Sequence, residues 1–328
     1  GEHGLFDFTQ KVPGQYRIRF VNATDRAGAT LFRRVSDAGA SVLSLGMPTT
    51  FPPEPINGLL VCGFDAPVSR GTSGRSASDP ALYERVAAKT GPWMRPDLDE
   101  GAEHDAWHER ALDVLLDRIA RKQAFGLEAL AQLRARGDEV ALFCVVFSES
   151  DTVCHHFWRD HDADSPRHDP AASARRRDAV ALVYERLDAA CGAFIEAFGS
   201  DAACFVVSDH GAGGAARRVV HLNRRLEEAG LLARSRPGGG LDGLARGARD
   251  LVLRVLPDAV SEAIFRRARP AAARVESAAR FGGFDWSRTC AFSEEVNTQP
   301  GVWINLEGRE AAGSVAAADY ERVRDDVI

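Results

Sequence analysis

The run EVALFCVVF, residues 139–147, decides the fold class of this chain. After Glu139, eight apolar residues follow one another without a polar interruption, which is typical of a strand buried on both faces in the centre of a parallel sheet. Helical apolar spacing precedes the run at residues 108–136 and follows it at residues 171–198. A buried strand between two helices indicates an α/β fold with a mostly parallel sheet.

Two further apolar runs are expected to join the same sheet. Residues 40–45 (ASVLSL) follow a helical pattern at residues 29–38 that ends at Gly39, a residue type favoured just after a helix C-terminus. Residues 202–207 (AACFVV) follow the helix expected at residues 171–198. Because helices and strands alternate along the chain, both runs are predicted to be parallel strands.

Two polar, glycine-containing segments interrupt this alternation, at about residues 66–110 and 230–284, and are expected to be insertions that form helical caps. The organisation predicted for the 328 residues is a single α/β domain over residues 1–328 that carries these two insertions. The domain is expected to be truncated at both ends, because the first residue is Gly1 rather than Met and Ile328 falls within a helical pattern.

The composition limits the classes of partner and compartment. The net charge is 41 − 47 = −6, so the chain lacks the positive field that would attract nucleic acid. No apolar run approaches the roughly 20 residues needed to span a bilayer, and no membrane span is expected. The six cysteines form no CxxC pair, a usage that predicts a reducing, cytoplasmic location. The composition leaves the oligomeric state open.

Metal-type side chains follow two of the predicted strands. Asp151 and His155, four residues apart, come after residues 139–147, and the adjacent Asp209 and His210 come after residues 202–207. The carboxyl ends of parallel strands meet at one edge of a sheet, where sites are usually built. Carboxylate oxygens and imidazole nitrogens are ordinary ligands of zinc and similar divalent ions. Four such donors predict two metal positions rather than one closed structural site.

Each of these motifs also has an ordinary structural interpretation. The pair Asp151 and His155 could be a surface pair on a helix, and Ser208-Asp209-His210-Gly211 could be a simple turn. Both motifs at equivalent strand ends are less readily explained by chance. Glu149 could support a metal ligand or be a solvated residue at a strand end, and Asn305 could touch substrate or fix a turn.

Taken together, the motifs resemble the alkaline phosphatase superfamily and, within it, the type I phosphodiesterase/nucleotide pyrophosphatase-like branch. The resemblance covers essentially the whole chain and is specific as an ordered set. The segments that carry it are residues 1–8 (GEHGLFDF), 52–58 (PPEPING), 151–158 (DTVCHHFW), 206–211 (VVSDHG), 222–226 (LNRRL), 230–232 (GLL) and 304–310 (INLEGRE).

The resemblance implies a three-layer αβα sandwich and two zinc-like ions at the carboxyl edge of its sheet. By position, Asp151 and His155 resemble ligands of the first ion, and Asp209 and His210 resemble ligands of the second. The family completes these sites with a further His, a further Asp and a Thr or Ser nucleophile. No residue of this chain matches those three, so the Asp and the nucleophile are expected upstream of Gly1 and the His downstream of residue 328.

The function implied by the resemblance is metal-dependent hydrolysis of phosphate esters, with a phosphodiester or a nucleotide-like small molecule as substrate. Two alternatives stay open. One is a non-catalytic, metal-binding remnant of the fold, since no nucleophile is matched in the chain. The other is a phosphomutase- or sulfatase-type relative, although a sulfatase needs a CxPxR-like motif and none of the six cysteines lies in one.

Overall fold

The computed structural model divides the chain into two compact units, one formed by Ala27–Arg217 and the other by Gly1–Arg26 together with Arg218–Ile328. The single domain expected over residues 1–328 stays a prediction, because much of both insertions lies outside the described residues. The structure describes residues 2–63, 66, 73–93, 105–199, 201–235, 273–295 and 301–328.

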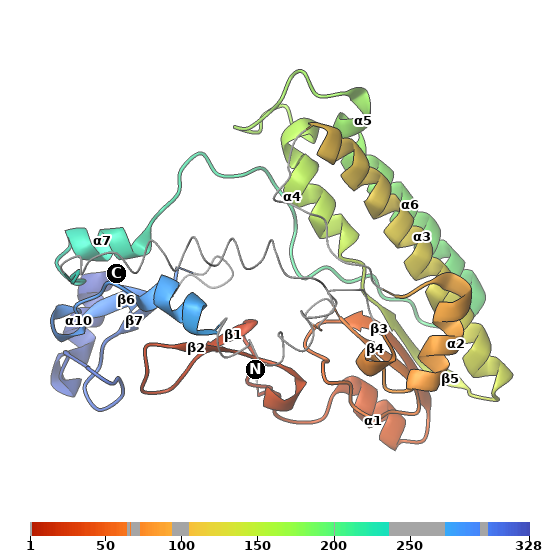
Figure 1. Ribbon diagram of the computed structural model, residues 1–328, viewed down its shortest axis with the longest axis horizontal. Coiled ribbons are helices and arrows are strands. Elements are labelled where there is room, and N and C mark those ends of the chain that lie inside the picture. Colours follow the sequence, from red (N-terminus) through yellow and green to blue (C-terminus); the bar gives the residue numbers. More distant parts are fainter. Residues whose placement is uncertain are drawn as a thin grey trace. The chain divides into compact units, whose positions relative to one another are not determined.

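The unit Ala27–Arg217 is built on a parallel three-stranded sheet (Figure 1). Its central strand is β3 (Ser41–Met47), which pairs with β4 (Gly58–Cys62) on one side and β5 (Val140–Val145) on the other. Strands β3 and β5 coincide with two of the runs expected to be strands, and β3 is buried as expected. Residues 139–147 were expected to be a central strand buried on both faces, but β5 lies at an edge of the described sheet and is only partly buried. The parallel α/β class predicted for the chain is therefore confirmed.

Helices cover both faces of this sheet (Figure 1). On one face, Val42 and Leu60 pack with Phe32 of α1 (Leu31–Asp37). On the other face, Leu43 and the neighbouring apolar residues of β3 and β4 pack with Phe125 of α3 and with α2. Alternate residues of each strand thus enter two separate cores, as the pleat of a strand requires. This is the layering expected of a three-layer sandwich. The two helices of the second face span Asp105–Ala135 (α3) and Pro80–Thr90 (α2).

The helices that follow β5 in the chain pack together with α3. Helix α4 (Glu149–His161) begins shortly after the strand, and α6 (Ala179–Phe198) packs with it and with α3 through a buried apolar cluster. The helix expected at residues 171–198 is divided into two parts, because α5 (Ala174–Arg177) begins at a separate cap in which Ser173 accepts a hydrogen bond from the Arg176 amide.

The strand expected at residues 202–207 is not formed, and this prediction was wrong. The segment has no regular secondary structure and is exposed, with Phe205, Val206 and Val207 each more than 80% accessible. Within the described ranges, its only backbone hydrogen bond is the one that the Ala202 amide donates to Gly199. An apolar run becomes a strand only when a neighbouring backbone completes its ladder of hydrogen bonds, and composition alone does not supply that neighbour.

The other unit contains two small antiparallel hairpins and several short helices. Asn305, which the sequence left between substrate contact and turn formation, is fully buried there. Its amide nitrogen donates to the carbonyls of Trp286, Thr289 and Ala312 at 2.8–3.0 Å, and its oxygen accepts from the Tyr16 hydroxyl at 2.6 Å. These bonds occupy its side chain and establish a structural role. The hairpins are β1 (Thr9–Lys11) with β2 (Ile18–Phe20) and β6 (Ala291–Ser293) with β7 (Val302–Ile304), and the helices include α7 (Leu222–Glu228), residues 273–281 and α10 (Tyr320–Val327).

Among the helices of the described ranges, none is both long enough and apolar enough to cross a lipid bilayer. The longest is α3, whose polar and charged residues are spread along its length.

Candidate metal centre

The first pair of candidate ligands lies in the opening turns of α4. Because α4 begins four residues after the end of β5, Asp151 lies at the carboxyl edge of the sheet. Asp151 and His155 are one helical turn apart and therefore share a face of the helix. The distance from Asp151 Oδ1 to His155 Nε2 is 3.4 Å.

The second pair lies on the irregular segment that follows α6. Although this segment is not a strand, it brings His210 to the same place, with His210 Nε2 3.8 Å from Asp151 Oδ1. The same nitrogen is 3.8 Å from Asp209 Oδ2. The structure therefore gathers all four residues expected from the sequence into one donor set, formed by Asp151, His155, Asp209 and His210, with Asp151 at its centre.

The ring of His210 is oriented by the backbone of the next residue, Gly211. Its Nδ1 lies 2.8 Å from the carbonyl oxygen of Gly211, which suits an Nδ1–H donor and leaves Nε2 directed towards Asp151. This hydrogen bond, followed by the charges of Asp209 and Asp151, raises the pKa of His210 above its usual value. A metal-ligating histidine usually donates one ring N–H to a carbonyl or carboxylate and binds the ion through its other nitrogen, and the bond to Gly211 would leave Nε2 of His210 for that role.

The chemistry of the donor set fits divalent ions of the zinc type, since it offers two carboxylates and two imidazoles. The side chains are accessible to solvent, from 50% for Asp151 to 90% for Asp209. Within the described ranges, no three His, Cys, Asp or Glu side chains converge on one ion position. The donors are thus arranged as linked pairs, and each ion would need ligands besides those of the described residues.

The sequence did not reveal how the start of α4 is held. Glu149 was considered as a supporting residue or as a solvated one, and the structure shows it 1% exposed and paired with Lys122 of α3. The solvated interpretation is therefore wrong. Lys122 precedes Glu149 by 27 residues, and no motif connects the two; a lysine and a glutamate within otherwise apolar helix faces are the only signal.

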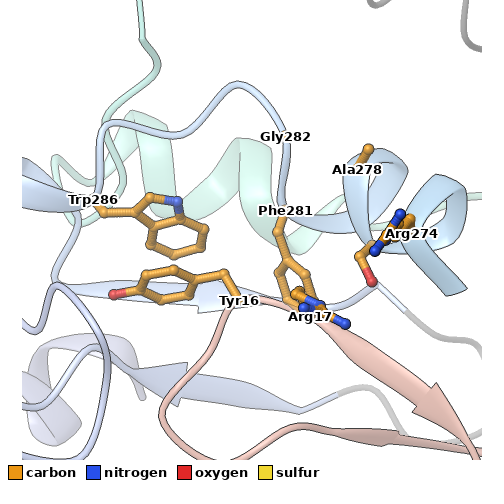
Figure 2. A pocket seen from close by; sticks show the side chains of 8 residues that line it. Tyr16, Arg17, Arg274, Ala278, Phe281, Gly282 and Trp286 are labelled. Carbon is orange, nitrogen blue, oxygen red and sulfur yellow. The ribbon is translucent and has the colours of Figure 1, made fainter. Parts of the chain in front are cut away.

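The other unit contains a shallow hollow whose lining residues differ in kind from the donor set (Figure 2). Tyr16 and Trp286 stack there with ring centroids 3.5 Å apart, and the hollow has a volume of about 280 Å³. Two arginines, Arg17 and Arg274, stand on its other side (Figure 2). Among the described residues that line it there is no His, Cys, Asp or Glu, so it lacks the ligands of a metal centre.

Comparison with known proteins places the chain in a family. No curated protein matches it, and no solved structure matches it. The family model for type I phosphodiesterase / nucleotide pyrophosphatase matches residues 1–328, which is the whole chain. The chain therefore belongs to the type I phosphodiesterase/nucleotide pyrophosphatase family, a branch of the alkaline phosphatase superfamily that comprises phosphodiester and pyrophosphate hydrolases.

Proposed function

We propose that this protein hydrolyses phosphodiester or nucleotide pyrophosphate bonds with two divalent ions, most simply zinc. Asp151 and His155 would hold one ion, and Asp209 and His210 would hold the other. The observation that carries the proposal is the donor set itself: four metal-type side chains from separate parts of the sequence lie in a continuous chain of contacts of 3.4–3.8 Å.

Bound ions would supply Lewis acidity to a phosphoryl oxygen and would lower the pKa of a hydroxyl nucleophile. The residues of the chain would position the site around these ions. Asp151 lies between the imidazoles of His155 and His210, so its carboxylate fixes the spacing of the two halves of the site. The carbonyl of Gly211 fixes the orientation of the His210 ring.

The hydroxyl nucleophile is proposed to come from residues other than those described, as the family resemblance implies. The two hydroxyls beside the donor set in the sequence are already engaged. Thr152 Oγ1 donates to the Ser148 carbonyl at 3.0 Å, and Ser208 Oγ donates to the His210 carbonyl at 2.6 Å. A hydroxyl that donates its proton to a fixed carbonyl is poorly placed to lose that proton during attack.

Metal content tests the ligand assignment directly. In the full-length protein we expect up to two equivalents of zinc or a similar ion, and Asp209→Ala with His210→Ala is expected to remove about one of them. The matched control is His161→Ala with Asp164→Ala, an exposed His/Asp pair outside the donor set, which should leave the stoichiometry unchanged. Equal metal content in the two double variants would refute the assignment.

Hydrolysis tests the reaction class. The full-length protein is expected to cleave bis(4-nitrophenyl) phosphate faster than 4-nitrophenyl sulfate, and a chelator is expected to abolish the activity. A preference for the sulfate ester would overturn the proposed substrate class. Binding of ions without hydrolysis of phosphodiesters or nucleotide pyrophosphates would support the alternative of a non-catalytic remnant.

A further inference from the structure

A buried ion pair lies beneath the start of α4. Lys122 of α3 places its Nζ 2.9 Å from Oε1 and 3.0 Å from Oε2 of Glu149, the first residue of α4. The two side chains are only 5% and 1% exposed. The ammonium thus contacts both carboxylate oxygens in a site that excludes most water.

The same ammonium also contacts the end of the strand that leads into α4. Lys122 Nζ lies 3.4 Å from the carbonyl oxygen of Val146 and within 6 Å of the ring centres of Phe147 and Trp93. The Trp93 ring is itself confined, because it lies against β3 at Gly46, where an added Cβ would be 3.0 Å from Cζ2. Lys122 therefore joins both sides of the bend between β5 and α4.

Stability alone does not account for this pair. Removing two charges from water carries a large cost, and buried ion pairs can often be replaced by apolar residues without loss of stability. Lysine is also rare in this chain, where Lys and Arg together number 41 and only Lys11, Lys89 and Lys122 are lysines. A compact ammonium in this position is suited to fixing a geometry, because it can donate to the strand end and the helix start together.

The N-cap of α4 does little to anchor the start of the helix. Within the described part of the chain, the N-cap residue Ser148 makes no side-chain hydrogen bond to the first helical amides. A carboxylate in the first turn is favoured by the helix dipole, and the pairing of Glu149 with Lys122 fixes where that turn lies.

We propose that Lys122 and Glu149 are positioning residues that set the place of the Asp151 carboxylate in the donor set. Asp151 follows Glu149 by two residues in the same helical turn, and each residue of an α-helix turns the side-chain direction by about 100°. A shift of one residue at the helix start would therefore break the contacts of Asp151 with His155 and His210. This inference rests on the proposed function, because it assigns the pair a role in holding the ion ligands.

The test replaces the pair with apolar residues so that no charge is left buried alone. In Lys122→Met with Glu149→Met, the melting temperature is expected to stay close to that of the unaltered full-length protein. Two other properties should change. Backbone amides of residues 152–155, the first with hydrogen-bond partners inside the helix, should exchange with deuterium faster in the metal-free protein, and Co²⁺ should bind about 10–100-fold more weakly, with an altered visible absorption band.

The matched control is the buried pair at the other end of the same helix. Arg176 Nε lies 2.9 Å from Asp160 Oδ2, with side chains 7% and 0% exposed. In Arg176→Met with Asp160→Leu, we expect Co²⁺ affinity within about twofold of the unaltered protein and unchanged exchange at residues 152–155. This control separates the general loss of an ion pair from a change at the start of α4.

The outcomes are distinct. If the unaltered protein binds Co²⁺ and Lys122→Met with Glu149→Met binds it equally well, the inference is overturned and the proposed function stands. If the unaltered protein binds no divalent ion, both are overturned. Weaker binding in both double variants to the same extent would also overturn the inference, since the start of α4 would then have no special role.

Discussion

Replacing glycine by alanine should destabilise the protein at Gly126, where α3 lies close to α6, and should stabilise it at Gly192, where an added Cβ meets no other atom. Gly126 lies inside α3, and a Cβ added there would be 2.8 Å and 2.9 Å from two ring carbons of Phe194 on α6 and 3.4 Å from Leu45 Cδ1. The ring has little room to move, because Phe194 is 6% exposed and packs edge-on against Phe143 with ring centroids 5.0 Å apart. Gly126 therefore allows the two helices to pack closely.

Gly126→Ala combines two opposing effects. Alanine stabilises a helix interior over glycine by about 1 kcal/mol, and forcing extra atoms into a packed core costs about 1–3 kcal/mol. We expect the free energy of unfolding to fall by up to about 2 kcal/mol. The control is Gly192→Ala on α6, where an added Cβ meets no atom within 4 Å and the helix gain of about 1 kcal/mol should remain.

The assay is urea denaturation followed by circular dichroism, with both variants compared with the unaltered chain. Gly192→Ala should be more stable than Gly126→Ala by about 1–3 kcal/mol, the overpacking cost alone. A double-mutant cycle tests whether the cost of Gly126→Ala comes from contact with the Phe194 ring. Phe194→Leu should cost less in the Gly126→Ala background than in the unaltered chain, since it removes the ring atoms that clash. Equal stabilisation by alanine at both glycines would refute the close packing of α3 on α6.

Three further predictions concern single residues. Asn305→Ala should lower the free energy of unfolding by about 2–4 kcal/mol, because it removes the side-chain donor of the Trp286 and Ala312 carbonyls and the acceptor of the Tyr16 hydroxyl, whereas the Thr289 carbonyl keeps Ser314 Oγ; a loss below about 1 kcal/mol in urea denaturation would contradict the structural role. Burial raises the pKa of Tyr16, so its contribution to stability should be complete below about pH 10 and should be lost as the pH rises through the raised value. Absorbance titration of the chain against Tyr16→Phe should show one tyrosine ionising late, and no difference between the two curves would exclude the shift. Burial also raises the pKa of the Cys144 thiol, so iodoacetamide should label the exposed Cys204 well before Cys144, as peptide mass analysis would show.

Local apolar patterns predicted the elements whose burial is decided by their own residues. The runs that became β3 and β5 are mostly apolar because both faces of each strand meet packed side chains: Val42 and Leu43 of β3 enter opposite cores, and Leu142 and Phe143 of β5 pack against the same two cores. Residues 202–207 have an equally apolar pattern but lack a paired backbone in the described ranges, and they remain irregular and exposed. The pattern records which side chains avoid water, whereas strand formation also needs a neighbour that the pattern does not specify.

In the candidate site, too, the sequence indicates some features and the tertiary structure is needed for the others. Asp151 with His155, and Asp209 with His210, could be recognised because each pair is close in the sequence and has a metal-type composition. The joining of the two pairs through Asp151 and His210 depends on tertiary structure, and so does the contact between Lys122 and Glu149. Neither contact has a sequence spacing that distinguishes it from any other pair of charged residues.

The donor set and its support differ sharply in exposure, and this difference indicates how the site would work. The four donors are 50–90% exposed, whereas Lys122 and Glu149 beneath them are 5% and 1% exposed. Exposed side chains change rotamer readily, so the geometry of the donors cannot come from their own packing. It must come from the backbone that carries them, and on the Asp151 side that backbone is fixed by the end of β5, the start of α4 and the ammonium between them. On the His210 side the segment has no paired strand among the described residues, and the ring is oriented by the carbonyl of Gly211. We therefore expect ion affinity to be more sensitive to changes beneath Asp151 than to changes in the segment before Asp209, because only the first half of the site has a rigid support to lose.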